Sequence, residues 1–303
     1  MGKTSKKPKK KESNSPLPFL ELERKYAFGP EHIYKGDIAV EYKTVFDLAV
    51  ENISRLSVPF VRAGGGLLIA PYPQKTTCRT RYYLSDEDLL AANYGIEIRQ
   101  DRDSLVIKTP AAEVSEGGTQ SRFEMSIDLK NNKPITNIGH IISRSKEGLK
   151  FKDLPPLIRK HFTRATKLHQ MIKTGSYRHK FKYSRKIDTY EVEFEFACDV
   201  GTATTLNGLH YDIDQIELEI KSVKDKKGRD ITKYILEKPA LRALLEEALD
   251  SEELFITDLG LQRVDGSKAT PGMEHLKQNK SNDDNVVPMR RKASGLPSTL
   301  AVA

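Results

Sequence analysis

Two short segments of this chain carry the side chains best suited to chemistry. Glu21-Leu22-Glu23-Arg24-Lys25 lies near the N-terminus, and Glu217-Leu218-Glu219-Ile220-Lys221 repeats its pattern much later in the chain. On a β-strand, residues two apart share a face, so each copy places two carboxylates and one ammonium on one side. If the two strands lie close together, four carboxylates meet, and a hard divalent cation with oxygen ligands relieves their repulsion. A single copy is more typical of a solvated strand face on which Glu and Lys neutralise each other.

Several other segments alternate apolar and polar residues with a period of two, which predicts strands. These segments are Leu20–Lys25, Arg81–Leu84, Gly95–Gln100, Ser104–Thr109, Ser121–Leu129, Tyr183–Ile187, Tyr190–Cys198 and Ile216–Lys221. Their polar positions are rich in cations and include the acids Glu124 and Asp199. A barrel that gathered these side chains inward would hold an acidic end beside a basic wall. Such a lumen suits a chain of phosphates, because guanidinium and ammonium groups match phosphate oxygens while Mg²⁺ bridges phosphates to carboxylates.

The elements that must position these side chains are mostly antiparallel strands. Turn residues at Asp101–Asp103, Asn131–Pro134 and Gly201 predict hairpins. Helical spacing predicts helices over Lys43–Leu56, Leu154–Lys173 and Ile231–Leu249, with a shorter one over Asp86–Asn93. The fold class is therefore α+β, with helices covering the apolar face of the sheet.

The same residues, in the same order, resemble the CYTH domains, or triphosphate tunnel metalloenzymes. The hallmark E-x-E-x-K strand of that family is matched at Glu21, Glu23 and Lys25. The later motifs of the family resemble Tyr82–Asp86, Gly95–Arg99, Leu105–Lys108, Arg122–Glu124, Arg185, Asp199–Gly201 and Glu217–Lys221. The resemblance covers about residues 17–270 and implies a closed antiparallel β-barrel, a tunnel of about eight strands with helices packed outside.

The resemblance also implies roles for particular residues. Mg²⁺ or Mn²⁺ would be held by Glu21, Glu23, Glu217 and Glu219. The triphosphate would be bound by Lys25, Arg81, Arg99, Lys108, Arg122, Arg185 and Lys268. Catalytic roles would fall to Lys25, Glu124 and Asp199, with a metal or a lumen carboxylate activating the attacking water.

Two positions depart from the family pattern. The family has a paired R-x-R, and here the segment reads Arg99-Gln100-Asp101. The second arginine is therefore replaced by Asp101, unless Arg102 takes its place through a bulge. The usual Y-x-D-T element reads Tyr83-Leu84-Ser85-Asp86. These departures limit the expectation to triphosphate chemistry in general.

Composition and charge define the rest of the chain. The chain has 303 residues and a net charge of +8, and residues 1–16 are expected to form a disordered basic tail before a domain over 17–270. Residues 271–303 are expected to form a second disordered tail, and both tails could contact nucleic acid or polyphosphate. The two cysteines lack metal-ligand spacing and fit a reducing compartment. With no apolar run long enough for a membrane helix, we expect a cytoplasmic protein that does not contact membranes.

Three functions remain open from the sequence. The first is a metal-dependent hydrolase of inorganic triphosphate or of an organic or nucleoside triphosphate. The second is an adenylate cyclase that uses the same tunnel, since the family resembled here includes such enzymes. The third is a non-catalytic module that binds polyphosphate or RNA ends. The acidic strands favour an enzyme, because inward carboxylates would only repel the ligand of a simple anion binder.

Overall fold

A computed structural model describes residues 19–29, 31–33, 35–62, 74–85, 94–111, 119–265 and 268–284. Its strands are β1 (Phe19–Phe28), β2 (Gln74–Ser85), β3 (Glu97–Asp101), β4 (Ser104–Pro110), β5 (Gln120–Asp128), β6 (Leu168–Ile187), β7 (Tyr190–Thr205), β8 (His210–Lys224) and β9 (Leu261–Arg263). Its helices are α1 (Ile38–Arg62), α3 (Ile138–Arg144), η1 (Phe151–Asp153), α4 (Pro156–His161), η2 (Thr232–Glu237), α5 (Pro239–Thr257) and α6 (Thr270–Asp284).

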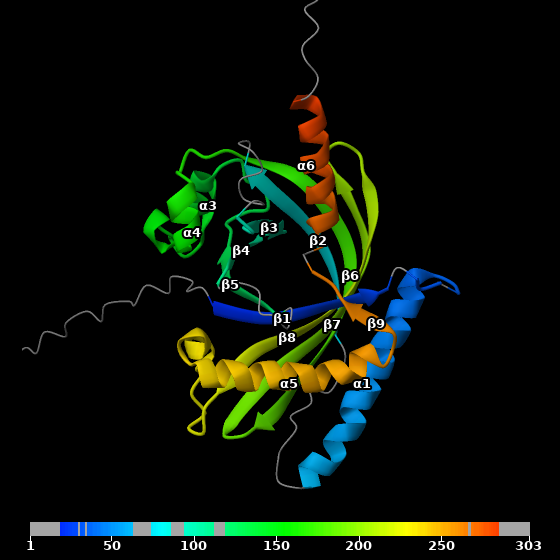
Figure 1. Cartoon of the computed structure of the whole chain (residues 1–303). Coiled ribbons are helices and arrows are strands. Elements are labelled where there is room, and N and C mark those ends of the chain that lie inside the picture. Colours follow the sequence, from blue (N-terminus) through cyan, green and yellow to red (C-terminus); the bar gives the residue numbers. More distant parts are fainter. Residues whose placement is uncertain are drawn as a thin grey trace, which may run out of the picture.

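The strands form one antiparallel sheet that closes on itself. Their order is β5-β4-β3-β2-β6-β7-β8-β1-β9, and β5 also pairs with β1. The β5–β1 pairing closes eight strands into a barrel and leaves β9 as a short extension beside β1 (Figure 1). The closed antiparallel barrel with outer helices, expected from the sequence, is confirmed.

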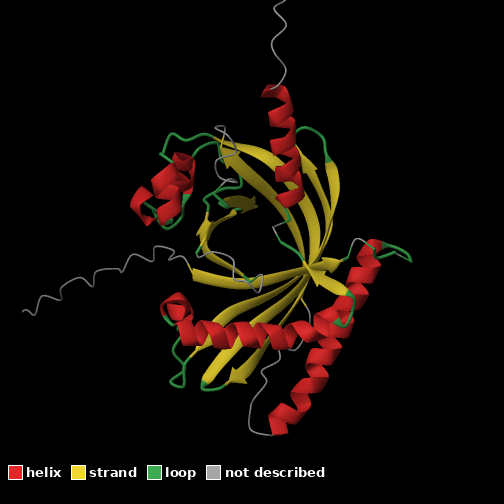
Figure 2. Ribbon diagram, in the orientation of Figure 1, coloured by secondary structure: helices red, strands yellow, loops and turns green. Residues whose placement is uncertain are grey.

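The helices lie outside the barrel, where they cover its apolar surface (Figure 2). Helices α1 and α5 pack on one side, and α3 and α4 lie on another (Figure 1). The alternation within the strands explains this arrangement. In β1, for example, Leu20, Leu22 and Tyr26 are buried in the outer core, while Glu21 and Lys25 face the lumen.

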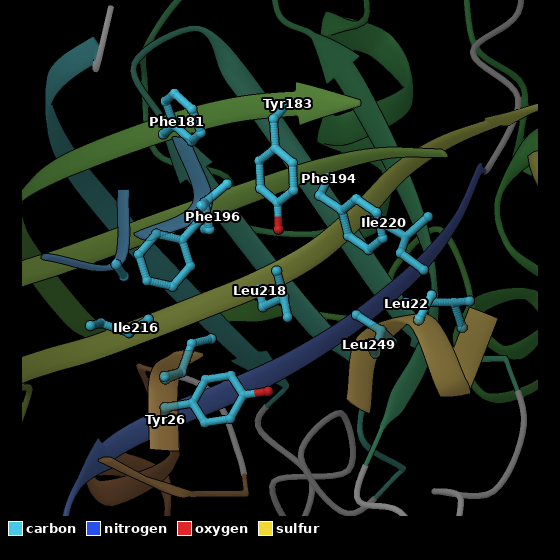
Figure 3. Packing of buried hydrophobic residues seen from close by; sticks show 14 of the residues in the cluster. Leu22, Tyr26, Phe181, Tyr183, Phe194, Phe196, Ile216, Leu218, Ile220 and Leu249 are labelled. Carbon is cyan, nitrogen blue, oxygen red and sulfur yellow. The ribbon is translucent and has the colours of Figure 1, made fainter. Parts of the chain in front are cut away.

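Two apolar clusters fill the space between barrel and helices. The larger joins β1, β6, β7 and β8 to α1 and α5, and includes the stacked rings of Phe46 and Phe196. Figure 3 shows its centre, where Phe194, Leu218 and Ile220 pack toward Leu249 of α5. The smaller cluster lies beneath α3 and α4. Each fully buried side chain of this size contributes about 1.5–3 kcal/mol, so these clusters hold the barrel wall in place.

Several predicted elements are corrected by the structure. The helix predicted over Leu154–Lys173 is wrong, because this stretch holds only the short helix α4 before β6 begins at Leu168. Gly201 does not form a turn: it lies inside β7, opposite Ser176 of β6. The predicted helix over Ile231–Leu249 is divided into η2 and the longer α5. The Lys43–Leu56 helix is confirmed within α1, and Asp86–Asn93 lies outside the described residues.

The C-terminal part of the described chain ends in a helix. Residues 270–284, which fall mostly within the polar tail expected from residue 271, form α6. None of the described helices has the length and apolar character that crossing a membrane requires.

Candidate active site

The two E-L-E-x-K segments lie on neighbouring strands. β1 and β8 pair antiparallel, with Glu23 opposite Glu219 and Lys25 opposite Glu217. Residues directly opposite on antiparallel strands share a face and lie within contact distance. The four carboxylates therefore occupy one wall of the barrel, as the sequence pattern predicts.

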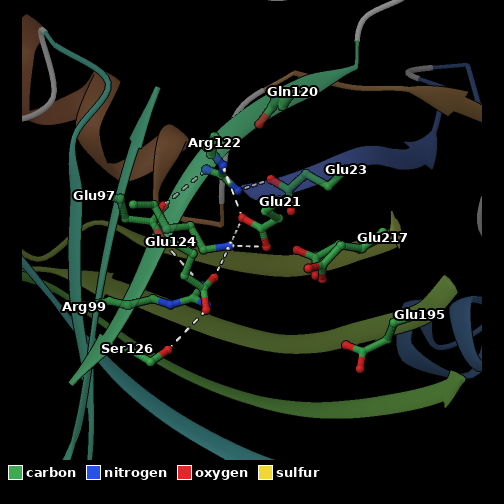
Figure 4. A network of polar contacts seen from close by, with 12 residues as sticks. Glu21, Glu23, Glu97, Arg99, Gln120, Arg122, Glu124, Ser126, Glu195 and Glu217 are labelled. Atoms are coloured by element: carbon green, nitrogen blue, oxygen red, sulfur yellow. Dashed lines mark hydrogen bonds and ion pairs between the residues drawn. The ribbon is translucent and has the colours of Figure 1, made fainter. Parts of the chain in front are cut away.

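A cavity of about 570 Å³ runs through the barrel between these strands and the opposite wall. Among the described residues that line this tunnel, nine are acidic and nine are basic. Ten of the site residues expected from the sequence line it, namely Glu21, Lys25, Arg99, Lys108, Arg122, Glu124, Asp199, Glu217, Glu219 and Lys268. Glu23 is buried beside the cavity and contacts Arg122 (Figure 4).

Lys108 of β4 links Glu21 of β1 to Glu124 of β5. Its Nζ lies 2.6 Å from Glu21 Oε2 and 3.0 Å from Glu124 Oε2. Burial would raise the pKa of Glu21, but Lys108 and Arg122 outweigh burial and hold it below its usual range. Glu21 is therefore fully ionised at neutral pH.

Lys25 lies among the carboxylates of the β1–β8 wall. Its Nζ is 2.9 Å from Glu23 Oε1, and Glu23 also pairs with Arg122. Burial lowers the pKa of Lys25 to about 8, against the opposing effect of Glu217. Near neutral pH Lys25 is mainly an ammonium, placed to meet phosphate oxygens.

Glu219 is the least compensated carboxylate of this wall. Its partner is Lys221, 2.6 Å away on the same strand. Burial and the nearby charge of Glu21 raise the pKa of Glu219 to about 7. This wall thus has more negative charge than its own cations offset.

A second cluster gathers three carboxylates around one guanidinium. Arg178 of β6 lies 2.7 Å from Asp199, 2.8 Å from Glu217 and 3.1 Å from Glu195. Burial opposes its charge, but the three carboxylates raise the pKa of Arg178 above its usual value. Arg178 therefore bridges carboxylates of the β7–β8 wall, as Lys108 bridges carboxylates of β1 and β5.

Lys268 reaches the same cluster from outside the barrel strands. Its Nζ lies 2.8 Å from Asp199 Oδ2 and 3.1 Å from Glu217 Oε1. Lys268 stands just before α6, and Tyr211 of β8 donates a hydrogen bond to its carbonyl oxygen at 3.0 Å. The segment between β9 and α6 thus supplies a cation to the tunnel.

Two of the expected triphosphate ligands lie elsewhere. Arg81 does not line the tunnel, because it pairs with Gln100 while its neighbour Tyr82 pairs with the inward Arg99. Arg81 Nη1 instead donates to the carbonyl of Asn132 at 2.9 Å.

Arg185 points to the opposite side of β6 from Arg178, with which it differs by an odd number of residues. Its Nη2 lies 3.1 Å from Glu252 of α5, and its guanidinium lies over the Tyr183 ring. Arg185 therefore belongs to the contact between barrel and helix, and its expected role in the tunnel is corrected.

Four charged lining residues were not singled out from the sequence: Glu97, Arg178, Lys180 and Glu195. Glu97 shares its face with Arg99, two residues later, and the two pair at 3.4 Å. The period-two rule applied to Arg99 would have identified it. Arg178 and Lys180 alternate with Tyr177, His179 and Phe181, a strand pattern hidden next to the helix wrongly predicted before it.

A divalent metal fits this site by the chemical type of its donors. Glu21, Glu23, Glu217 and Glu219 offer only carboxylate oxygens, which Mg²⁺ and Mn²⁺ prefer. Within the described part of the chain, no three acidic, histidine or cysteine side chains converge as they stand on a point that could hold a metal ion. Each carboxylate is held by a Lys or Arg, so metal binding would require these ion pairs to exchange partners.

No family model and no curated protein matches the chain. Among solved structures, it is similar to the S. pombe Pct1 RNA triphosphatase in complex with the Spt5 CTD, at 8% identity over 87% of this chain and 86% of that chain, with a TM-score of 0.26. It is also similar to S. pombe Pct1 RNA triphosphatase alone, at 10% identity over 87% and 85% of the two chains, with a TM-score of 0.22.

Proposed function

We propose that this protein hydrolyses a triphosphate inside the tunnel with the help of a divalent metal ion. The observation that carries the proposal is the equal number of acidic and basic side chains, nine of each among the described residues, that line one cavity. Charges with a purely structural role can lie on the solvent-exposed face of a sheet. These charges are instead enclosed in the barrel, where removing them from water is costly. Such a cost is expected where a site serves a function.

The balanced charge also explains why metal and phosphate would bind together. A bare triphosphate would enter a lumen whose cations are already paired with carboxylates. A metal–triphosphate complex allows an exchange, because the carboxylates can bind the metal while the released cations bind phosphate oxygens. Glu21, Glu23, Glu217 and Glu219 would hold the ion, which would supply charge neutralisation and Lewis-acid polarisation of a phosphoryl oxygen.

The chain's own cations would orient the phosphates for attack. Lys25, Arg99, Lys108, Arg122, Arg178 and Lys268 line the tunnel from several strands and could bind the phosphates along its length. These contacts fix the position of the terminal phosphorus and stabilise the charge that develops on its oxygens.

Glu124 is better placed than Asp199 to act as the general base. Asp199 is held by two cations, Arg178 and Lys268, whereas the ion pair that involves Glu124 is with Lys108. Glu124 would take a proton from water as the water oxygen bonds to the terminal phosphorus. The bond between that phosphorus and the bridging oxygen breaks, the terminal group is released as phosphate, and the rest of the substrate leaves as a diphosphate.

The proposal is tested by incubating the purified protein with Mg²⁺ or Mn²⁺ and tripolyphosphate, ATP, GTP or thiamine triphosphate. Chromatography separates released phosphate from cyclic nucleotide. We expect metal-dependent phosphate release from at least one of the four substrates. Absence of turnover of all four, with polyphosphate still bound, would exclude the enzyme.

A matched pair of variants assigns the activity to the tunnel. Glu21→Gln combined with Glu23→Gln should abolish the metal-dependent release. Glu191→Gln combined with Glu193→Gln has the same spacing on β7, and neither residue lines the cavity, so its activity should remain. Equal activity of the two double variants would show that the metal assignment is wrong.

A further inference from the structure

A second polar cavity, of about 820 Å³, lies beside the tunnel on strands β2, β6 and β7. Its charged lining residues are Arg81, Arg102 and Lys173, and no acidic side chain lines it among the described residues. The other lining residues are threonines, an asparagine and a glycine. We call this cavity the basic groove. In contrast to the balanced tunnel, it has only positive charge.

The basic groove and the tunnel share part of their lining. Thr80, Arg102 and Thr174 line both cavities. Arg102 stands at the β3–β4 turn in the left-handed region, with φ 53, so its side chain is placed at the boundary between the two. On the tunnel side of the same turn lie Asp101 and Asp103. A molecule bound in the tunnel can therefore extend past this turn into the groove.

Two cations of the groove lie directly opposite each other. Arg81 of β2 pairs in register with Lys173 of β6. Like charges at directly opposite positions on antiparallel strands are destabilising. Within the described residues, neither side chain forms an ion pair. Arg81 instead donates a hydrogen bond to the carbonyl oxygen of Asn132. An anion bound between Arg81 and Lys173 would relieve their repulsion.

We propose that the basic groove binds further phosphate groups of an inorganic polyphosphate chain whose end lies in the tunnel. This inference rests on the proposed function and defines its substrate as longer than a triphosphate. Guanidinium, ammonium and hydroxyl groups are the donors that suit phosphate oxygens. None of the described residues that line the groove is aromatic, so these residues offer no platform on which a nucleobase could stack.

The test compares chain lengths in a groove variant. Arg81→Gln combined with Lys173→Gln removes two charges and leaves all tunnel-lining residues in place. The KM for tripolyphosphate should remain within about twofold of the unaltered protein. The KM for a long-chain polyphosphate should rise by about tenfold, which corresponds to about 1.4 kcal/mol. Lys226→Gln combined with Lys227→Gln, in the turn after β8, is the matched control and should change neither value, since neither residue lines the tunnel or the groove.

A binding measurement separates this inference from the proposed function. Anisotropy of a fluorescent long-chain polyphosphate is measured with the full chain in EDTA, where the basic N-terminal segment is the same in every variant. If the groove variant binds the long chain more weakly, the groove is supported as a polyphosphate-binding site. This holds even if no substrate is turned over, in which case only the proposed hydrolysis fails. If the protein hydrolyses its substrate but all variants bind the long chain with equal affinity, the proposal that the groove binds polyphosphate is wrong. A 5′-triphosphorylated oligonucleotide is added as a competitor. If it competes for the unaltered protein but not for the groove variant, and polyphosphate binding is the same in both, the proposal is also wrong, because the groove would then bind a nucleic acid.

Discussion

Arg178 of β6 donates to the carboxylate of Glu217 on β8, at 2.8 Å, across the intervening strand β7. The same Nη1 donates to Asp199 of β7 at 2.7 Å, so one guanidinium joins three consecutive strands of the barrel. The contact lies inside the tunnel, whereas Arg185, on the same strand, pairs with α5 outside it.

The two arginines of β6 should therefore differ in their effect on substrate binding. Arg178→Gln removes a charged donor from the tunnel, and charged hydrogen bonds contribute about 1.5–3 kcal/mol. The KM for the metal–tripolyphosphate complex should rise about 10- to 100-fold. Arg185→Gln should leave KM within about twofold, although it removes a buried ion pair. Steady-state kinetics and calorimetric titration measure both, and a larger effect on KM from Arg185 would contradict the placement.

Removal of the buried Arg24 of β1 should strongly destabilise the fold. It is 1% exposed and donates to Asp250 at 2.7 Å, to Glu253 at 2.8 Å and to Thr119 at 2.8 Å. It thereby joins β1 and the start of β5 to α5 at the seam where the barrel closes. Breaking a buried ion-pair network typically costs about 3–5 kcal/mol, so Arg24→Ala should lower the free energy of unfolding by about that amount.

The exposed pair of Arg229 with Asp225 is the control for Arg24. Arg229 is 67% exposed, and removing an exposed partner costs about 0–1 kcal/mol. Urea denaturation followed by circular dichroism compares Arg24→Ala with Arg229→Ala. Similar losses in the two variants would show that Arg24 does not stabilise the seam.

Gly201 should not tolerate a side chain. A Cβ at this position would lie 2.1 Å from the Gly175 carbonyl oxygen and 2.5 Å from Ser176 Cα, both on β6. The backbone would have to shift, and overpacking of this kind costs about 1–3 kcal/mol or more. Gly201→Ala should therefore lower Tm by several degrees. Gly175→Ala, on the partner strand with nothing within 4 Å, should not, and equal melting of the two variants would refute the close approach.

Glu252 should make the stability of the unaltered protein depend on pH. Burial raises its pKa above the usual 4.5, although Arg185 and Tyr183 act in the opposite direction. An acid with a raised pKa in the folded state binds more protons folded than unfolded, so its stabilising contribution is complete below about pH 4.5 and falls as pH rises through the raised pKa.

Glu252→Gln removes that dependence and keeps an acceptor for the Tyr183 hydroxyl, which donates to Glu252 at 2.8 Å. The difference in unfolding free energy between the unaltered protein and Glu252→Gln should shift in favour of the variant as pH rises from 4.5 toward neutrality. Urea denaturation at several pH values measures it. A difference that stays constant, or moves the other way, would contradict the raised pKa.

The sequence predicted the strands with clear alternation and the face on which their charges lie. In β1 the pattern Glu21, Glu23, Lys25 against Leu20 and Leu22 already separates lumen from core. The strands β1 and β8 are adjacent because β1 is the closing strand, and closure depends on pairings between residues far apart in the chain. Alternation within one strand contains no information about such pairings.

The placements of Arg81 and Arg185 outside the tunnel have a common physical origin. Arg81 and Tyr82 are neighbours on opposite faces, and only the pairing of Tyr82 with Arg99 shows which of them points inward. Arg185 was assigned to the lumen by its position in a motif, yet it stands an odd number of residues from Arg178. The face of a strand is set by its register with the neighbouring strands, which a single sequence does not display.

The closing position of β1 has a consequence for synthesis on the ribosome. β1 is translated first, and its partner β8 emerges only after most of the barrel. At about 5–20 residues per second, that delay is on the order of 10–40 s. During this interval one edge of β1 lacks its partner strand. The apolar side chains of Leu20, Leu22 and Tyr26 also lack the β8 residues that belong to the same cluster. The acidic wall of the tunnel is thus assembled late in translation, from the first strand and one of the last.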